Sequence, residues 1–317
     1  MIHGLRQSTA TQYIEPARQR ANFALIQGAE ATSLILENKR CVGLRFIKDG
    51  VEQEVRASRE VIVSCGAANS PKLLELTGIG TPEILRSHGI AVRHALPGVG
   101  ENLRDHYAGI MKWRLNRPGL SLARRGRGFG LVLEILKYVF FRRGFIAQGN
   151  GSLRVFARSR PELSDADIMM IMNPYIIELK EGRSRRMSTT EGFFVFTHVQ
   201  RPESTGSVHI RSSEPLAPPL IEYRFLATDY DRETAVAAVR RAREIAQAAP
   251  LSSVIAEEMQ PGRKVQSDAD ILDFLRKEGN ITHHMVGTCK MGTDPMAVVD
   301  ERLRVHGVDG LRVADAS

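Results

Sequence analysis

The stretch that decides the fold is Glu60-Val-Ile-Val-Ser-Cys-Gly-Ala-Ala-Asn-Ser-Pro-Lys-Leu-Leu-Glu-Leu-Thr-Gly-Ile-Gly80. Its first part, Glu60 to Gly66, is apolar without alternation, which is typical of a strand buried on both faces in a mostly parallel sheet. Ser70 and Pro71 suit the cap and the first position of a helix, which a later glycine ends. The stretch therefore predicts a strand, a glycine turn and a helix.

The turn at Gly66 has two interpretations. A helix N-terminus after a buried strand offers backbone N–H groups and the positive end of a dipole to an anionic ligand. The same geometry also serves as a tight strand-to-helix connection that binds nothing. The residues of this stretch favour neither interpretation over the other.

Short apolar segments surround this stretch on both sides. Before it, residues 23–28 and 31–36 are predicted to be strands, and 42–47 pairs with 51–57 across the turn Lys48-Asp49-Gly50. After it, residues 113–277 alternate strands and arginine-rich loops, which indicates an α+β region. The clearest predictions there are strands at 192–199 and 206–211 and helices at 231–249 and 267–277. A final strand is expected at 311–315.

Composition limits the class of protein. The chain has 317 residues, 43% hydrophobic and 25% charged, which predicts two globular domains and excludes intrinsic disorder. Its three cysteines, Cys41, Cys65 and Cys289, are odd in number and widely spaced, so they predict neither a disulfide framework nor a zinc pair. A reducing, cytoplasmic compartment is the simplest expectation, with peripheral attachment to the inner membrane as the alternative.

The net charge of +8 comes from arginine clusters at 124–127, 142–143, 183–186 and 240–243. Such clusters suit nucleic acid electrostatically, but they are scattered and lack an accompanying aromatic pattern, so nucleic-acid binding is not expected. The N-terminal residues lack the apolar core of a secretory signal. The apolar stretch 131–145 is interrupted by four charges, and no transmembrane segment is expected.

The segment His283-His284-Met-Val-Gly-Thr-Cys-Lys-Met-Gly292 carries the strongest polar signal. Neighbouring histidines on an extended segment point to opposite sides, so they are not expected to share a metal, and no metal site is predicted. Nothing in the sequence indicates a lowered thiol pKa for Cys289. The residues alone favour a structural histidine over a catalytic base.

Four blocks together resemble one family. Gly66 to Gly80 resembles the second signature of the glucose/methanol/choline (GMC) flavin oxidoreductases, with Thr77 where serine is usual. The resemblance continues through 96–106, through 201–206, and through the histidine block with 298–300 and 311–317. The blocks occur in the family's order over nearly the whole chain.

The resemblance implies the architecture of the chain. It implies an α/β FAD-binding domain that is discontinuous, with residues 1–106 and the return segment 282–317. An α+β substrate domain with an antiparallel sheet, residues 107–281, is inserted between them. This division agrees with the change in sequence character near Trp113.

The resemblance also implies FAD-dependent oxidation of an alcohol to the aldehyde, the substrate being choline or an aliphatic or aromatic primary alcohol. His284 matches the family's base, which takes the hydroxyl proton while hydride passes to the flavin, and an ordinary histidine pKa of ~6.5 suits that role. Ala31, Gly66, Asp315 and Ala316 match cofactor-binding positions. A quinone, a dye-like carrier or oxygen is expected to accept the electrons.

The chain also departs from the family pattern. It has no Gly-x-Gly-x-x-Gly near its start, and it ends before the family's second catalytic residue. From this we expect a flavin domain truncated at both ends and an isolated chain with impaired activity. The alternative is a non-catalytic fragment that needs a complementing partner.

Overall fold

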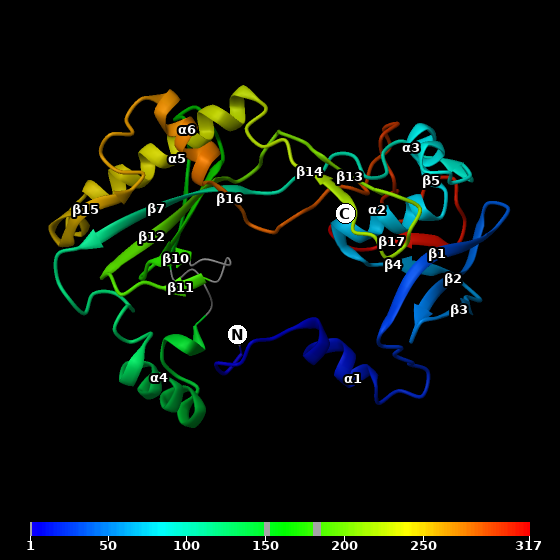
Figure 1. Ribbon diagram of the computed structural model, residues 1–317, viewed down its shortest axis with the longest axis horizontal. Coiled ribbons are helices and arrows are strands. Elements are labelled where there is room, and N and C mark those ends of the chain that lie inside the picture. The colour runs from blue at the N-terminus through cyan, green and yellow to red at the C-terminus, as the bar shows by residue number, and fades with distance from the viewer. Residues whose placement is uncertain (1, 149–152, 180–184) are drawn as a thin grey trace. The chain divides into compact units, whose positions relative to one another are not determined.

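A computed structural model describes residues 2–148, 153–179 and 185–317 (Figure 1). It divides into two compact units, each built from three segments of the chain. Unit 1 comprises Met1–Leu25, Tyr107–Arg201 and Asp229–Thr282, and unit 2 comprises Ile26–His106, Pro202–Thr228 and His283–Ser317. Both units mix helices with sheets, and the larger sheet is antiparallel.

Unit 2 contains a three-stranded antiparallel meander, as the sequence predicts. Strands β1 (Ala29–Glu37), β2 (Arg40–Lys48) and β3 (Val51–Arg56) follow one another in the sheet. The turn between β2 and β3 has positive φ at both Asp49 and Gly50, which is the conformation that a tight hairpin requires. Residues 23–28, however, form no strand, and that prediction is wrong. Leu25 and Ile26 are exposed there, so the apolar run is not covered by a neighbouring sheet.

The deciding stretch folds into β4 (Val61–Val63) and α2 (Gly66–Leu76). β4 pairs in parallel with β17 (Leu311–Val313), side by side in Figure 1, which confirms a parallel strand. The expectation that both faces are buried is wrong, because Ile62 is 54% exposed between two buried valines. Only one face of this strand pair lies on the core.

The helix α2 begins five residues earlier than Ser70 and Pro71 indicate. Its first residue is Gly66, and Pro71 lies inside the helix, where its missing N–H leaves the carbonyl of Ala67 without its helical donor. The hydroxyl of Thr288 donates to this carbonyl at 2.7 Å. A tertiary contact thus replaces the bond that proline removes, and the sequence pattern around α2 cannot show it.

The rest of unit 2 surrounds this centre. The short elements are β5 (Ile79–Gly80), α3 (Pro82–Ser87), β6 (His94–Ala95), β13 (Ser207–His209) and β14 (Leu220–Glu222). β13 packs against α2. The core consists of buried aliphatic side chains from the meander, α2 and the C-terminal segment, among them Leu34, Leu74, Val298 and Leu311.

Unit 1 is built on a six-stranded antiparallel sheet in the order β15–β7–β12–β9–β8, with β16 also paired to β7. Its strands are β7 (Tyr107–Leu115), β8 (Leu153–Ala157), β9 (Ile168–Asn173), β12 (Gly192–Val199), β15 (Ile255–Gln260) and β16 (Asn280–Ile281). Two short strands, β10 (Ile177–Leu179) and β11 (Arg185–Met187), pair separately. The predicted strand at 192–199 is confirmed as β12.

Two helices pack on this sheet, as Figure 1 shows: α5 (Asp229–Gln247) on β12 and β9, and α6 (Asp268–Glu278) on β7. Both predicted helices are confirmed, and Ser267 caps α6 in a capping box with Asp270. On α5 the expected apolar stripe is buried except for Ile245, which is 37% exposed. Arg243 of α5 and Glu258 of β15 form a two-pronged ion pair that ties helix to sheet.

The remaining helical elements are η1 (Ala10–Ile14), α1 (Glu15–Ala17), α4 (Gly128–Phe141), η2 (Phe145–Ala147) and η3 (Leu251–Val254). Helix α4 forms from the interrupted apolar stretch, where no helix was predicted. None of the described helices combines the length and apolarity that crossing a membrane requires. Of the predicted arginine cluster at 183–186, Arg183 lies outside the described residues.

The boundaries of the units can be compared with the predicted domains. The chain changes unit between His106 and Tyr107 and between Thr282 and His283, at or within one residue of the predicted breaks. Residues 1–25 and 202–228 fall in the other unit from that expected. The second segment does so because it contains β13, which packs on α2. The assignment of the units to flavin and to substrate stays a prediction.

Candidate functional site

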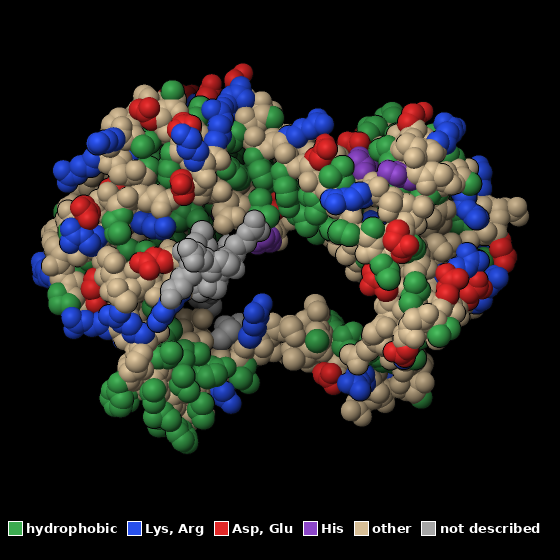
Figure 2. Space-filling model, viewed as in Figure 1, with side chains coloured by type: hydrophobic (Ala, Val, Ile, Leu, Met, Phe, Trp, Pro, Cys, Tyr) green, Lys and Arg blue, Asp and Glu red, His purple; other side chains and the backbone are tan. Residues whose placement is uncertain are grey.

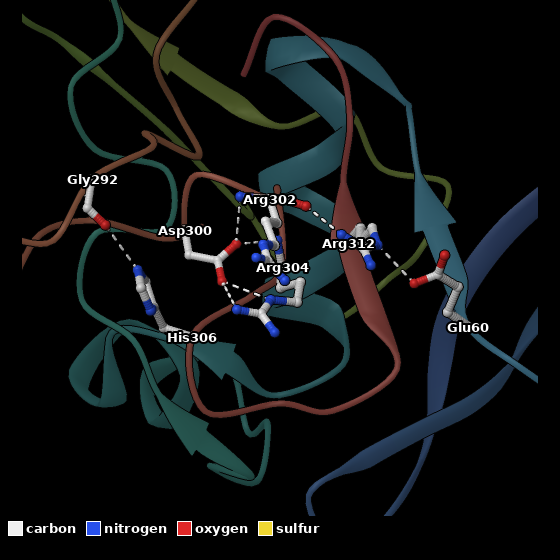
Figure 3. Close-up of polar contacts among 7 residues, drawn as sticks. All are labelled: Glu60, Gly292, Asp300, Arg302, Arg304, His306 and Arg312. Atoms are coloured by element: carbon white, nitrogen blue, oxygen red, sulfur yellow. Dashed lines mark hydrogen bonds and ion pairs between the residues drawn. The ribbon is translucent and has the colours of Figure 1, made fainter.

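The pairing of β17 with β4 positions the C-terminal candidate residues. Arg312, in the middle of β17, donates to Glu60 at 2.7 Å, and Glu60 lies just before β4 (Figure 3). Arg312 also donates to the backbone carbonyl of Arg302. These contacts reinforce a register in which Val313 lies opposite Val63, so that Asp315 follows beside the Gly66 turn.

The loop before β17 is braced by Asp300. Its carboxylate accepts the backbone N–H groups of Arg302 and Arg304, each at 2.9 Å, and the Arg304 Nε–H at 2.7 Å (Figure 3). The hydrogen bond with the Arg304 side chain, above all, lowers the pKa of Asp300 to about 2. His306 contacts the carbonyl of Gly292 at 3.0 Å. These contacts hold the loop at Asp300 and at His306, before β17 begins.

Asp315 lies at the start of α2. Its Oδ2 accepts the Gly66 N–H at 2.8 Å and the Ser70 hydroxyl at 2.5 Å, and its Oδ1 accepts the Ser317 N–H at 2.8 Å. Burial works against ionisation here, but the hydrogen bonds from Ser317, Ser70 and Gly66 lower the pKa of Asp315. The carboxylate is therefore ionised at neutral pH.

This arrangement decides what the turn can bind. The N–H of Gly66, one of the groups expected to face an anionic ligand, is taken by a carboxylate of the same chain. A second anion at this position would be repelled by Asp315. The turn is therefore suited to a ligand that brings hydrogen-bond donors, such as the hydroxyl groups of a polyol chain, rather than to a phosphate.

The histidine block is joined to the same place by two hydrogen bonds. The N–H of Gly287 donates to the carbonyl of Ala316 at 3.0 Å. Thr288, fully buried, makes the bond to Ala67 described above. The segment around residue 66 thus forms one hydrogen-bonded cluster with the segments around residues 287 and 316, which lie more than 200 positions later in the chain.

His284 lies at the exposed edge of this cluster. Its backbone N–H donates to Asp105 Oδ1 at 2.9 Å, and its ring stands edge-on to the ring of His106, with 5.8 Å between centroids and 87° between planes. His283 beside it has a φ of +62°, in the left-handed region, so the chain turns sharply just before His284. An accessible imidazole on an anchored backbone is the arrangement that a proton-accepting group needs.

A pocket of about 270 Å³ lies at Ala31. It is lined by Ala29, Glu30, Ala31, Cys65, Asn69, Lys72, Leu73 and Leu76, and it therefore reaches from β1 to the Gly66 turn. Pockets for drug-sized ligands occupy about 300–1,000 Å³. A space of this size accepts one ring system of a dinucleotide, not the whole molecule.

The residues present are compatible with part of an FAD. The pocket combines apolar walls for a ring with the carboxylate of Glu30 and the ammonium of Lys72. Beside it, a Cβ placed on Gly66 would meet no atom within 4 Å, so the space next to this glycine is open. Ala31 would hold one part of the cofactor, and Gly66 with Asp315 and Ala316 would hold the part next to it.

An ionic triad centred on the buried Glu75 supports the C-terminal end of α2. Glu75, fully buried, bonds His209 Nδ1 at 2.7 Å and accepts the Ile210 N–H at 2.7 Å, and His209 Nε2 lies 3.1 Å from Glu101. Burial opposes protonation of His209, but the hydrogen bond and charge of Glu75, with Glu101, raise its pKa. The triad ties the returning segment 202–228 to α2.

The cysteines do not contribute a nucleophile. Burial raises the pKa of Cys289 to about 12, and burial also raises the pKa of Cys65. All three cysteines are free thiols. Within the described parts of the chain, no three histidine, cysteine or acidic side chains gather in a way that could hold a metal ion.

Four of the five candidate positions thus lie in or beside one cluster, and Ala31 lies in the pocket that adjoins it. Sequence reasoning missed His106, Lys72 and Thr288. Asp105 and His106 end the block 96–106, and the two adjacent polar residues are the signal that the sequence offers there. Nothing local marks Thr288, whose partner Ala67 is 221 positions away, or Lys72, which lines the pocket together with residues of β1.

Comparison with family models gives two matches. The N-terminal model of the GMC oxidoreductases matches residues 2–108, and the C-terminal model of the same family matches residues 202–317. Together they cover most of the chain and include every candidate residue.

Curated relatives align along almost the entire chain. An oxygen-dependent choline dehydrogenase of Rhizobium meliloti is 39% identical over 99% of the chain, and an alcohol dehydrogenase [acceptor] of Pseudomonas putida is 33% identical over 99%. An uncharacterised GMC-type oxidoreductase of Mycobacterium tuberculosis is 36% identical over 99%. The chain spans about 57–58% of the length of these relatives.

Solved structures share the fold. A pyridoxine 4-oxidase from Mesorbium loti superposes with a TM-score of 0.84 at 25% identity, covering 100% of this chain and 58% of its own. A fungal aryl-alcohol oxidase gives a TM-score of 0.85 at 21% identity, covering 99% and 60%.

Proposed function

The chain belongs to the GMC oxidoreductase family, whose cofactor is FAD, and we propose that it carries the alcohol-oxidising site of such an enzyme. The proposed reaction converts a choline-like, aliphatic or aromatic primary alcohol to the aldehyde. The observation that carries the proposal is the hydrogen-bonded cluster that joins Gly66, Asp315, Ala316 and Gly287 beside His284. Relatives named choline dehydrogenase and alcohol dehydrogenase support the substrate class.

Bound FAD supplies the hydride acceptor for the carbinol carbon. The role of this chain is to hold the cofactor and to take the proton. Ala31 holds one part of the cofactor, Gly66 the part next to it, and the ionised Asp315 accepts hydrogen bonds from hydroxyl groups. His284 Nδ1 or Nε2, unprotonated, accepts the proton of the substrate hydroxyl, and His106 bounds the space on one side of that ring.

A flavin-reduction experiment tests the role of His284. The chain is incubated with FAD, freed of oxygen and mixed with choline, a primary aliphatic alcohol or a benzylic alcohol while the visible flavin absorption is followed. His284→Gln is expected to slow bleaching by about 10²–10⁴-fold without changing FAD binding. The neighbouring exposed His283→Gln is the matched control and should keep the wild-type rate. Equal rates for wild type and His284→Gln would remove His284 as the base.

The isolated chain is proposed to bind FAD weakly and to turn over slowly, because its sequence has no Gly-x-Gly-x-x-Gly to hold the pyrophosphate. Stoichiometric FAD after purification would contradict this.

The electron acceptor is proposed to be a quinone, a soluble dye-like carrier or oxygen, and turnover with and without air separates oxygen from the others. The free thiols suit a cytoplasmic location.

A second candidate function is favoured by the uncovered face of β4. Ile62 is 54% exposed in the middle of a parallel strand pair, a class of sheet that is ordinarily covered on both faces. The chain would then be a non-catalytic fragment that needs a complementing partner. Restoration of FAD binding by a separately purified N-terminal segment of a relative would favour this function, and FAD binding by the chain alone would exclude it.

A further inference from the structure

The helix α4 presents its apolar side chains outward. Eight large apolar residues of this helix are between 42% and 77% exposed: Phe129, Val132, Leu133, Ile135, Leu136, Val139, Phe140 and Phe141. At 100° per residue, all but Phe141 fall within one arc of about 160° around the helix axis. In Figure 2 the green side chains gather over α4, with blue basic side chains beside them. The arc is therefore a continuous surface rather than a set of scattered residues.

The opposite face of α4 is polar and turned inward. Glu134 is 2% exposed, and its carboxylate accepts hydrogen bonds from Arg125 at 2.7 Å, Lys137 at 3.0 Å and the Phe145 N–H at 3.2 Å. The Arg125 hydrogen bond, above all, lowers the pKa of Glu134 to about 2. On the same side, a Cβ on Gly130 would lie 2.5 Å from the carbonyl of Arg124. Both contacts fix the rotation of the helix, so the apolar arc cannot turn inward.

Positive charge surrounds this arc. Residues 117–148 contain seven cationic side chains and a single carboxylate, the buried Glu134. The cations are Arg117, Arg124, Arg125, Arg127, Lys137, Arg142 and Arg143. Arg127 is the N-cap of the helix and Arg142 the C-cap, with Arg143 next to it, so both ends of the helix are basic. An apolar arc between two basic ends fits a surface that offers acyl chains flanked by phosphates.

We propose that α4 docks the protein on an anionic phospholipid bilayer, lying in the plane of the interface. The charge favours a bilayer over a second copy of the chain, since two copies would bring their own basic ends together. The helix has 14 residues, about 21 Å at 1.5 Å per residue, too short for the ~30 Å core of a bilayer. The helix therefore rests in the interface. This inference is independent of the proposed reaction.

Vesicle flotation tests the proposal. The purified chain is mixed with phosphatidylcholine vesicles or with vesicles containing one quarter phosphatidylglycerol, at low and high salt. Binding is expected to the anionic vesicles and to weaken with salt, because the charge attraction is screened. The double variant Phe129→Ser/Phe140→Ser, which changes the two most exposed side chains of the arc, is expected to lose binding by more than about tenfold. A chain that stays unbound on anionic vesicles at low salt overturns the proposal.

Matched control variants show whether vesicle binding depends on α4 or on exposed apolar and basic side chains anywhere on the protein. Leu216→Ser/Leu220→Ser removes two leucines that are 57% and 42% exposed in unit 2, and it should bind as the wild type does. Arg142→Glu/Arg143→Glu should weaken binding by about tenfold or more, whereas Arg86→Glu/Arg93→Glu should not. Equal losses in control and test variants would overturn the assignment to α4. Unfolding temperatures of all variants establish that each is folded.

A fluorescent probe shows what covers the arc. Trp113 is the single tryptophan and is 2% exposed, so Phe140→Trp adds one exposed reporter. Its emission is expected to shift to the blue with anionic vesicles and to be quenched by brominated lipid. A blue emission without vesicles, or a dimer in light scattering that Phe129→Ser/Phe140→Ser converts to monomer, would show that protein covers α4 and would overturn the proposal.

Discussion

Helices α2 and α4 each carry a buried carboxylate, and they use it in opposite ways. On α2 the apolar residues Leu73 and Leu74 are buried, and Glu75 reaches partners 134 and 135 positions away. On α4 the apolar residues are outside, and Glu134 accepts hydrogen bonds from Arg125, Lys137 and the Phe145 N–H, all within 11 positions. One carboxylate joins distant segments around a site, while the other holds a surface helix in one orientation.

The comparison shows that a buried carboxylate can have different structural roles in different helices. A buried carboxylate is unfavourable unless hydrogen-bonded partners compensate, so its partners reveal what it holds together. Long-range partners make α2 the centre of unit 2, where the candidate site lies. Because the partners of Glu134 are local, α4 is held by its neighbouring segments, and its apolar outer face remains exposed. The predictions that follow test this contrast, beginning with the largest expected effect.

Removing the α2 carboxylate should cost the most. Glu75→Ala leaves His209 and the Ile210 N–H without their buried partner, and breaking such a pair costs about 3–5 kcal/mol. Urea unfolding of the purified chain measures this. The control Glu83→Ala on α3, whose side chain is 79% exposed, should change little. A cost below that of the control would mean that the triad does not stabilise unit 2.

Part of this stabilisation should depend on pH. His209 has a pKa raised above its ordinary 6.5 in the folded protein. The stabilisation is therefore complete below about pH 6.5 and is lost as pH rises through the higher folded value. Unfolding curves from pH 6 to pH 9 should show this loss in the wild type and not in His209→Gln. A loss of equal size in both would assign the pH dependence to another group.

The hydrogen bond from the Thr288 hydroxyl replaces the helix bond that Pro71 removes, and its loss should have the next largest effect on stability. Thr288→Val leaves the buried Ala67 carbonyl unsatisfied, at a cost of about 1–3 kcal/mol. Thr288→Ser keeps the hydroxyl and should retain most of the stability. The same urea experiment compares them, and a serine variant as unstable as the valine variant would point to packing rather than the hydrogen bond.

The α4 carboxylate should have the smallest effect. The side chains of Arg125 and Lys137 are 51% and 53% exposed, and half-exposed pairs of this kind contribute about 0.2–1 kcal/mol, so Glu134→Gln should cost no more. Because the folded pKa of Glu134 is lowered to about 2, its contribution is present above pH 4.5 and disappears as pH falls toward 2. The stability difference between wild type and variant should narrow over that interval. If Glu134→Gln lowered the free energy of unfolding more than Glu75→Ala does, the predicted order of the two carboxylates would be wrong.

Local patterns predicted much of the secondary structure. The meander, β12, α5 and α6 follow from alternation, helical periodicity and the Ser267 capping box, all of which act within a few residues. The start of α2 could not be predicted in this way. Ser70 and Pro71 look like a helix start, but Asp315 serves as the partner of Gly66 from 249 positions away.

The sequence by itself determined the family, the parallel strand beside a helix and the polar residues available for chemistry, because motifs and propensities are local properties of the chain. Only the tertiary structure decided where those residues meet. It placed Asp315 on the N-terminus of α2, Thr288 on the carbonyl that Pro71 leaves free, and the apolar side of α4 outward. The physical reason is that buried polar groups must find partners wherever the fold brings them, and distance along the chain does not limit that choice.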